Sequence, residues 1–502
     1  MNANLFAHLE ASIADANRTA ITEIDGNTYS FGDLIALAGQ LANVLVARGV
    51  KPGDRVAVQV EKSVMAIALY LATVRAGAVF LPLNTAYTYA EVGYFINDAQ
   101  PALIVCEPSR QACMQQFVDA VGAAIETLDS QGQGSLAQAA AGANTAFSTV
   151  ERGDNDLAAI LYTSGTTGRS KGAMLSHRNL TSNLYSLIEA WQFTAADVLI
   201  HALPIYHTHG LFVATNVALF SGARIIFLPK FDADQILNVM PTATVLMGVP
   251  TFYVRLLQSQ GLEKASADMR LFISGSAPLL AETHEEWKRR TGHAILERYG
   301  MTETNMNTSN PYVGDRIAGT VGKALPSVIV QVTDPTTGDT LGRNEIGMIE
   351  VKGPNVFQGY WNMPEKTAEE FRNGGFFVTG DLGKIDDAGY LHIVGRQKDL
   401  VITGGFNVYP KEIEEEIDAL PGVVESAVIG VPHPDFGEGV TAIVIRAPGS
   451  EIDESSILHA ISERIAKFKL PKRVVFVSEL PRNAMGKVQK NILRERCKDL
   501  YL

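Results

Sequence analysis

The sequence predicts an α/β protein in which helices cover mostly parallel β-sheets, followed by two smaller units that contain β-strands. Helix, turn and strand patterns alternate along the first half of the chain, as they do in parallel sheets. From about Ser327 onward, short strands separated by glycine-rich turns replace the helices. Beyond residue 400 a compact α+β pattern of about 100 residues follows, which is within the usual size of a domain.

The alternation begins with a helix whose apolar face carries Leu34, Ala38, Leu41 and Leu45 and which we expect to end at Gly49. After a turn at 51–54, the expected order is strand 55–60, helix from Ser63, strand 78–81, helix from Tyr89 and strand 102–106. Residues 132–148 are rich in Gly, Ala, Ser and Gln, and we expect a loosely structured surface connection there. The strand at 157–161 precedes the most glycine-rich loop of the chain.

The last 100 residues or so have the pattern of a separate domain. We expect a helix from Pro410, strands 423–431 and 440–446, a helix from Asp453 and a strand at 473–477. The boundary is predicted near 396–399. This gives a large domain of residues 1–395, a connecting segment at 396–399 and a small domain of residues 400–502.

The composition excludes several classes of protein. A formal net charge of −12 disfavours nucleic-acid binding, which requires a basic surface. The most apolar stretch, residues 63–83, contains Arg75, Gly77 and Pro82 and is too interrupted to span a membrane. Three cysteines without a CxxC pattern and an N-terminus without a secretory signal predict a cytoplasmic protein with free thiols.

Residues 162–172, YTSGTTGRSKG, have the composition of a phosphate-binding loop. The glycines leave backbone N–H groups unhindered, and the hydroxyl groups and Lys171 add donors, so the loop can form an anion-binding nest. A P-loop requires lysine directly after glycine. Here Gly168 and Lys171 are separated by two residues, so we do not expect a P-loop NTPase.

The loop resembles the signature of the adenylate-forming superfamily, which includes acyl-CoA synthetases. Six further stretches resemble other motifs of that superfamily in the same order: HALPIYHTHG (201–210), SGSAPL (274–279), ERYGMTET (297–304), FFVTGD (376–381), GRQKDLVITGGFNVYPKEIE (395–414) and PRNAMGKVQK (481–490). The resemblance covers the chain from about residue 160 to its end. It implies a large nucleotide- and acyl-binding domain and a small mobile lid domain, and a reaction with ATP, Mg²⁺ and CoA.

The resemblance implies a role for each matching residue in the nucleotide site. The β- and γ-phosphates are expected on Thr163, Ser164, Gly165, Thr166, Thr167, Gly168 and Lys171. Gly275, Ser276, Ala277 and Tyr299 should surround the adenine, and Gly300 is also expected in the nucleotide site. Thr302 should bind the α-phosphate, and Asp381 and Arg396 should hold the ribose. Glu303 is the expected Mg²⁺ ligand, since Mg²⁺ needs only one or two carboxylates beside phosphate oxygens.

The small domain is expected to act in both half-reactions. Lys487 matches the lysine that reaches the attacking carboxylate and the α-phosphate, where a positive charge stabilises the transition state. Lys398 matches the hinge, and Gly404, Gly405 and Phe406 match the turn that meets the pantetheine arm of CoA. The resemblance also suggests a lysine acetyltransferase as a partner that would remove the charge of Lys487.

The residues around the expected acyl site favour a small dicarboxylic acid. The stretch after Glu303, residues 304–310, is almost wholly polar, which disfavours a long apolar tunnel. Arg298, or Arg255 after the strand-like VLMGVPTFY, could form a bidentate pair with a distal carboxylate. His207 is expected between the acyl and CoA sites, and Thr208 and Met306 should limit bulk near the α-carbon. This region resembles the malonate-activating members of the superfamily, so we expect malonate as substrate, with methylmalonate as a second candidate.

Other readings of these residues remain open. Arg298 could pair with Glu297 or with the nucleotide instead, and the acid could be another small or aromatic one. A zinc site on His201, His207 and His209 is not expected, because no cysteine or carboxylate lies close in sequence. A peptide-synthetase adenylation domain would require a carrier module, which we do not expect after Lys487. A non-catalytic nucleotide-binding protein would not need Lys487 and Glu303, and both are present.

Overall fold

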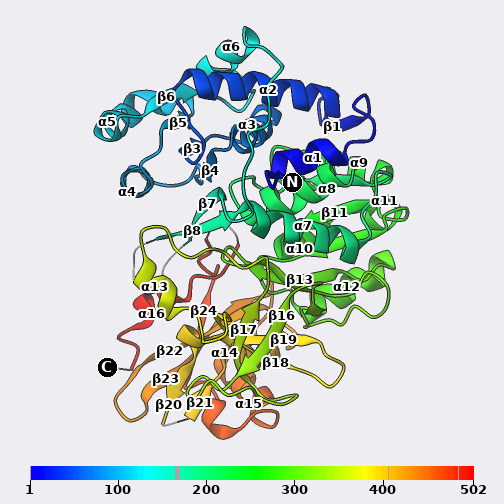
Figure 1. The fold of residues 1–502 in the computed structure, drawn as a ribbon. Coiled ribbons are helices and arrows are strands. Elements are labelled where there is room, and N and C mark those ends of the chain that lie inside the picture. Colours follow the sequence, from blue (N-terminus) through cyan, green and yellow to red (C-terminus); the bar gives the residue numbers. More distant parts are fainter. Residues whose placement is uncertain (1, 164–169, 405, 484–485, 502) are drawn as a thin grey trace.

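A computed structural model of the chain describes residues 2–163, 170–404, 406–483 and 486–501. The structure contains two large sheets, a small sheet and a C-terminal α+β unit, and the second large sheet takes its first two strands from the start of the chain (Figure 1). The predicted fold class, an α/β large domain with a β-rich subdomain and a small C-terminal domain, is confirmed.

The first large sheet has six strands in the order β6-β5-β3-β4-β7-β8. Its strands are β3 (Arg55–Gln59), β4 (Val79–Pro82), β5 (Leu103–Cys106), β6 (Ala124–Thr127), β7 (Leu157–Thr163) and β8 (Lys171–Ser176). The first four and β7 are parallel to their neighbours, whereas β8 returns antiparallel to β7 with Thr163 opposite Lys171. The predicted glycine-rich loop therefore joins the two strands of a hairpin.

The helices of this first unit follow the predicted order. They are α2 (Phe31–Ala47), α3 (Val64–Arg75), α4 (Tyr89–Ala99), α5 (Gln111–Val121) and α6 (Ser135–Ala141). Ser63 caps α3 by accepting from the Ala66 N–H. The prediction of a loosely structured connection at 132–148 is wrong in part, because α6 forms there and buries Leu136 and Ala140 against the core. Its alanines favour a helix, but the neighbouring glycines gave the segment the composition of a loop.

The second large sheet has nine strands in the order β15-β14-β13-β12-β11-β9-β10-β1-β2. The strands are β1 (Thr19–Glu23), β2 (Thr28–Ser30), β9 (Val198–His201), β10 (Arg224–Phe227), β11 (Val245–Gly248), β12 (Leu271–Ser274), β13 (Leu296–Met301), β14 (Asn305–Ser309) and β15 (Lys323–Ala324). The inner strands from β13 to β1 are parallel and the strands at both edges are antiparallel.

Helices of this second unit pack around the sheet and contribute to one continuous hydrophobic core. They are α1 (Leu5–Ser12), α7 (His177–Trp191), α8 (Asn216–Phe220), α9 (Ala233–Val239), α10 (Pro250–Leu257), α11 (Leu262–Ala265) and α12 (Ala281–Thr291). A π-helix at His209–Thr215 precedes α8. The strand-like reading of VLMGVPTFY is wrong, because the strand ends at Gly248 and Pro250 starts α10, where its fixed φ suits the first helical position.

The small sheet comprises β16 (Ile329–Thr333), β17 (Gly347–Lys352), β18 (Phe377–Ile385) and β19 (Leu391–Arg396), with α13 (Pro364–Glu369) between β17 and β18. A short 3₁₀ turn at Gln397–Asp399 then leads to the C-terminal unit. That unit has β20 (Val401–Thr403), β21 (Phe406–Val408), α14 (Pro410–Asp418), β22 (Val423–His433), β23 (Gly437–Arg446), α15 (Glu454–Ser462), β24 (Arg473–Val477) and α16 (Lys490–Cys497). Its hydrophobic core is separate from that of the large sheets.

Candidate active site

The candidate site is built at the carboxyl ends of parallel strands, where α/β sheets usually bind ligands. Residues 275–277 follow β12, residues 202–208 follow β9, and the turn 302–304 joins β13 to β14. Three other segments reach the same place: the ends of β7 and β8, the β18–β19 pair and the C-terminal loop that carries Lys487.

The expected ribose residues form a paired group. Asp381 and Arg396 lie opposite each other on β18 and β19, and Arg396 Nε is 2.9 Å from Asp381 Oδ1. The Tyr299 hydroxyl donates to Asp381 Oδ2 at 2.6 Å. Burial and the Asp381 charge hold the pKa of Tyr299 well above its usual value, and the same carboxylate raises the pKa of Arg396. Tyr299 therefore stays a hydrogen-bond donor.

The expected phosphate residues meet at Glu303. Its Oε1 accepts from the Thr163 hydroxyl at 3.4 Å and from the Tyr360 hydroxyl at 3.1 Å. Lys171 is buried over the Tyr360 ring and pairs with Glu370 at 3.4 Å. Thr163 and Lys171 thus flank the glycine-rich hairpin beside a carboxylate. Ser164, Gly165, Thr166, Thr167 and Gly168 lie outside the described residues.

The donor set around Glu303 fits Mg²⁺. Within the described part of the chain, Glu303 has no cation at ion-pair distance, although it is buried. A buried carboxylate needs a compensating charge. Glu303 would hold a divalent ion, whose charge would compensate that of the buried carboxylate.

Lys487 enters the site from the small domain. Gly486, with φ +75°, precedes it in a loop in which Asn483 and Lys487 hydrogen-bond to each other through their backbones. The side chain keeps solvent-accessible surface but is surrounded by protein, and desolvation followed by the charge of Arg396 lowers its pKa to about 8. Asp381, Glu303 and Arg298 also act on its charge. Residues from both domains therefore share one electrostatic environment.

Arg298 forms the centre of the expected acyl end. It is buried on β13, and its Nε and Nη2 have no hydrogen-bond partner among the described residues. No carboxylate of the described residues lies within ion-pair distance of it, and desolvation lowers its pKa to about 9. Glu297, the alternative partner, points to the other face of the strand, where its Oε1 accepts from the Leu279 N–H and burial raises its pKa to about 8. Glu297 is therefore mostly protonated at neutral pH.

Further unpaired polar atoms accompany Arg298. In the part of the chain that the structure describes, three buried atoms have no hydrogen-bond partner: Thr208 Oγ1, Ser274 Oγ and His209 Nε2. His209 Nδ1 lies 3.2 Å from the Ser276 hydroxyl. Burial and then the charge of Arg298 keep the pKa of His209 well below its usual value. His207 has its pKa lowered to about 4, first by burial and then by Lys487. Both imidazoles are therefore neutral at pH 7.

Glycines make room for these side chains. A Cβ on Gly275 would lie 2.5 Å from Arg298 Cζ, so the guanidinium packs directly against this backbone. A Cβ on Gly300 would lie 1.9 Å from the Asn305 carbonyl oxygen and 2.7 Å from Met306 Cε. Met306 is buried, and both its N–H and its carbonyl bond to the Asn183 side chain. Ala277 follows Ser276, which adopts a left-handed φ of +73°.

Arg255 is not brought to this cluster. It is exposed on α10, where its guanidinium lies 5.5 Å from the centre of the Phe231 ring. The interpretation of the polar run 304–310 as pocket lining also needs correction. Thr308 and Asn310 donate to the Val321 and Glu297 carbonyls, so part of the run satisfies buried backbone rather than a ligand.

The predicted CoA turn is also away from the site. Gly404 directly follows β20 and Phe406 is the first residue of β21, and both strands lie at the end of the small domain that is farther from β8 and β13 (Figure 1). Phe406 is exposed and stacks on Phe468. Gly405 lies outside the described residues. Lys398, the expected hinge residue, is exposed in the 3₁₀ turn between the domains.

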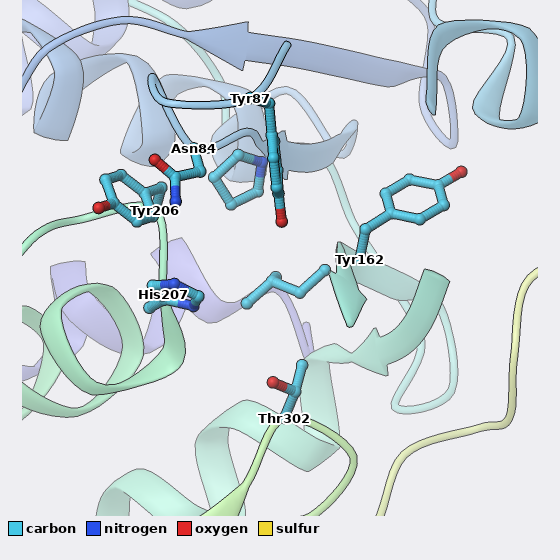
Figure 2. Close-up of a pocket in the computed structure, with 8 residues that line it drawn as sticks. Asn84, Tyr87, Tyr162, Tyr206, His207 and Thr302 are labelled. Carbon is cyan, nitrogen blue, oxygen red and sulfur yellow. The ribbon is translucent and has the colours of Figure 1, made fainter. Parts of the chain in front are cut away.

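A narrow pocket beside His207 and Thr302 contains residues that the sequence did not identify. Asn84 and Tyr87 face His207 and Thr302 across it, with Tyr206 at its side, and the Tyr162 hydroxyl points away (Figure 2). The signal was available, because Asn84 and Tyr87 directly follow β4, a parallel strand of the first sheet.

Among the described residues, no group of three or more His, Cys, Asp or Glu side chains is arranged to hold a metal ion. His201 Nδ1 contacts Lys62, and His209 Nδ1 contacts the Ser276 hydroxyl. None of the helices in the described part of the chain is both long and apolar enough to cross a membrane.

Comparison with known proteins identifies the family. Residues 10–361 match the model of the AMP-binding enzymes and residues 412–487 that of the AMP-binding enzyme C-terminal domain. The chain belongs to the AMP-binding enzyme family. The prediction made from its motifs is confirmed.

Similar proteins cover the whole chain. The crystal structure of ATP-bound MatB from Rhodopseudomonas palustris is 67% identical, with 100% of both chains covered and a TM-score of 0.99. The apo structure of that protein has a TM-score of 0.88 over the same coverage. The malonate–CoA ligase of Arabidopsis thaliana is 34% identical over 98% of this chain and 90% of its own length. The fold as a whole is therefore more similar to the ATP-bound structure than to the apo structure.

Proposed function

We propose that the protein is an ATP-dependent malonate–CoA ligase that forms malonyl-CoA through malonyl-adenylate and releases AMP and pyrophosphate. Membership of the family, the similarity to MatB and the similarity to a malonate–CoA ligase support this activity. Methylmalonate is a second candidate substrate. The alternative is a CoA ligase for another small or aromatic carboxylic acid.

One observation supports the dicarboxylic acid most directly. The Arg298 guanidinium is buried with two of its nitrogens unpaired. A buried cation without an anion is costly, so a substrate carboxylate that pairs with it gains binding energy. A monocarboxylic acid would use its only carboxylate for the reaction with ATP and leave Arg298 unpaired. The site therefore favours a substrate with a second carboxylate.

The proposed adenylation step depends on charge placed by both domains. A malonate carboxylate oxygen attacks the α-phosphorus, and the bond to pyrophosphate breaks. Asp381 and Arg396 would hold the ribose, Thr302 the α-phosphate and Lys171 the departing phosphates. Lys487 would bridge the attacking carboxylate and the α-phosphate, so that its charge opposes the repulsion between two anions. Mg²⁺ on Glu303 would neutralise the phosphate charge that these residues leave.

The second half-reaction requires a different arrangement of the domains. The CoA thiolate attacks the acyl carbon and displaces AMP, yet Gly404 and Phe406 lie away from the site while Lys487 occupies it. We propose that the small domain, residues 400–502, turns about a hinge at 396–399 between the two steps. Lys398 would then absorb backbone rotation, as an exposed residue between domains can. Neutral His207 would border the route of the thiolate.

Two further proposals concern the cellular setting. We propose that a lysine acetyltransferase can modify Lys487, since the side chain is accessible and acetylation would remove its charge. Intact-protein mass spectrometry after incubation with acetyl-CoA and such an enzyme would test it. We also propose a cytoplasmic location, which the free Cys106, Cys113 and Cys497 support.

A substrate panel tests the main proposal. Pyrophosphate release would be measured with malonate, methylmalonate, acetate, butyrate and benzoate, and thioester formation with free CoA. Malonate should give the highest kcat/KM. Arg298→Ala should lower the kcat/KM for malonate by about 30-fold or more, because it leaves the second carboxylate of malonate buried without its charged partner. Arg255→Ala is the matched control at an exposed position of α10. It should change the kcat/KM for malonate less than about twofold. Equal turnover of butyrate and malonate by the parent protein would reject the dicarboxylic acid.

A further inference from the structure

Lys62 is a buried lysine without an acidic partner. It lies between β3 and α3, and its Nζ is 2.8 Å from the His201 carbonyl, 2.7 Å from the Leu228 carbonyl and 3.1 Å from His201 Nδ1. Among the described residues, no carboxylate is at ion-pair distance from it. A lysine is rarely fully buried unless paired, because its desolvation is costly. Its position is therefore unlike that of an ordinary core residue.

The hydrogen bonds assign the protons of this pair. His201 Nε2 lies 2.9 Å from the Gly210 carbonyl oxygen, which can only accept, so Nε2 carries the hydrogen. His201 Nδ1 then accepts from Lys62. An ammonium has three N–H donors, which match the three acceptors around Lys62. Burial keeps the pKa of His201 well below its usual value, so the ring is neutral, and with a neutral ring only the ammonium form of Lys62 donates to all three acceptors.

The hydrogen bond from His201 connects this pair to the segment that borders the acyl site. Gly210 is the second residue of the π-helix, and its carbonyl also accepts from the Thr215 hydroxyl at 2.9 Å. A Cβ on Gly210 would lie 1.9 Å from the Pro204 carbonyl oxygen, so this backbone has no room to move on that side. π-helical turns are uncommon and are frequent at functional sites. His207, Thr208 and His209 directly precede Gly210.

We propose that Lys62 and His201 are positioning residues that fix the segment 207–209 against the acyl substrate. This inference rests on the proposed function. Neither residue touches the substrate. The ammonium of Lys62 fixes the ring of His201, and the His201 Nε2–H fixes the Gly210 carbonyl and with it Thr208 and His209. Loss of the pair should weaken malonate binding more than ATP binding, because Asp381 and Arg396 lie on other strands.

Two substitutions of His201 separate positioning from packing. His201→Leu fills a similar volume and removes the bond to Gly210, whereas His201→Gln keeps an N–H donor near the position of Nε2. His201→Leu should raise the KM for malonate about tenfold or more and leave the KM for ATP within about twofold. His201→Gln should recover most of this loss, since one hydrogen bond supplies about threefold to tenfold.

A milder substitution with its own control keeps the test valid if the His201→Leu variant does not fold. Thr215→Val removes one bond to Gly210 and should raise the KM for malonate about threefold. Thr73→Val is its matched control, because the Thr73 hydroxyl is equally buried and bonds only to the Leu69 carbonyl within α3. Thr73→Val should leave both KM values unchanged.

The outcomes are distinct. An equal rise in the KM for malonate and ATP, or malonate kinetics of Thr215→Val and His201→Leu within twofold of the parent, would overturn the positioning role. Failure of the parent protein to use malonate would instead reject the proposed function. A lower kcat with both KM values unchanged would indicate a smaller folded fraction, and it too would overturn the inference.

Discussion

The ribose end and the acyl end of the candidate site are both buried but differ in how their polar atoms are paired. At the ribose end, the two Asp381 oxygens contact Arg396 and Tyr299. At the acyl end, Arg298 keeps two unpaired nitrogens and Thr208 an unpaired hydroxyl. Buried polar groups without partners are rare and need an explanation. The simplest one here is that a ligand supplies the missing acceptor at the acyl end.

The comparison indicates where specificity lies. A nucleotide that enters the ribose end exchanges existing hydrogen bonds for new ones, so that end needs little rearrangement. An acid that enters the acyl end gains from Arg298 only if it brings a second negative charge. Sites that must pair a buried group discriminate strongly against ligands that leave it unpaired. The acyl end, which has unpaired polar groups, should therefore determine which acid binds, and the ribose end should bind the nucleotide.

Lys487 lies between the two ends, because the charges of Arg396, Asp381 and Arg298 all act on it. Lys487→Ala should reduce adenylation about 10²–10³-fold or more, since it removes the charge that joins the two anions. Thioester formation from supplied malonyl-adenylate should remain. Pyrophosphate exchange and CoA consumption measure the two steps. Lys498→Ala, a change at an exposed lysine of the same domain, is the control. Adenylation by Lys487→Ala near the parent rate would show that the two ends work without it.

Gly275→Ala perturbs the acyl end through the backbone. The new Cβ would overlap the Arg298 guanidinium, 2.5 Å from its Cζ, and displace it. We expect kcat/KM for malonate to fall about 10- to 100-fold, which corresponds to the cost of a misplaced charged hydrogen bond. Gly142→Ala is the matched control, because a Cβ there has nothing within 4 Å. Steady-state kinetics with malonate would measure both. An unchanged malonate KM in Gly275→Ala would argue that Arg298 does not face the substrate.

The sequence predicted the elements of this molecule better than the contacts between them. Alternating patterns identified most strands, and the helix predicted from Pro410 is α14. The helix α6 was missed because glycines surround its alanines. The pairing of Asp381 with Arg396 could be expected only from the family resemblance, because their register across β18 and β19 depends on a bulge that no local pattern shows.

Arg298 and Arg255 show why the acyl site was harder to predict. Both follow apolar stretches, and both could have faced a pocket. Arg298 lies on a strand with both faces covered, whereas the turn of α10 that begins at Pro250 places Arg255 on the exposed side. Lys62 gave no sequence signal either, because its partners are backbone carbonyls and a histidine from distant strands.

The pH dependence should separate Lys487 from Arg298. Burial lowers the pKa of Lys487 to about 8 and that of Arg298 to about 9. Adenylation requires the charged lysine, so kcat/KM, which reports the free enzyme, should fall about tenfold per pH unit above pH 8. Lys487→Arg should remove this fall, because an arginine at that position stays charged across the whole range. A profile of Lys487→Arg identical to that of the parent would exclude Lys487 as the titrating group.

The smallest effect should appear in the stability of the protein without ligands. Arg298→Met removes a buried charge that has no partner, so the free energy of unfolding should stay constant or rise by about 1–2 kcal/mol. Asp381→Asn breaks the ion pair with Arg396 and should lower it by about 1–3 kcal/mol. The expected rise in the free energy of unfolding on removal of Arg298 agrees with the lowered pKa of this residue. A cation whose pKa falls on folding destabilises the folded state at neutral pH. Thermal midpoints at pH 7, with and without malonate plus ATP, would measure both. If Arg298→Met lost as much stability as Asp381→Asn, Arg298 would already have a partner in the folded chain. The acyl end and the ribose end would then both be paired without a ligand.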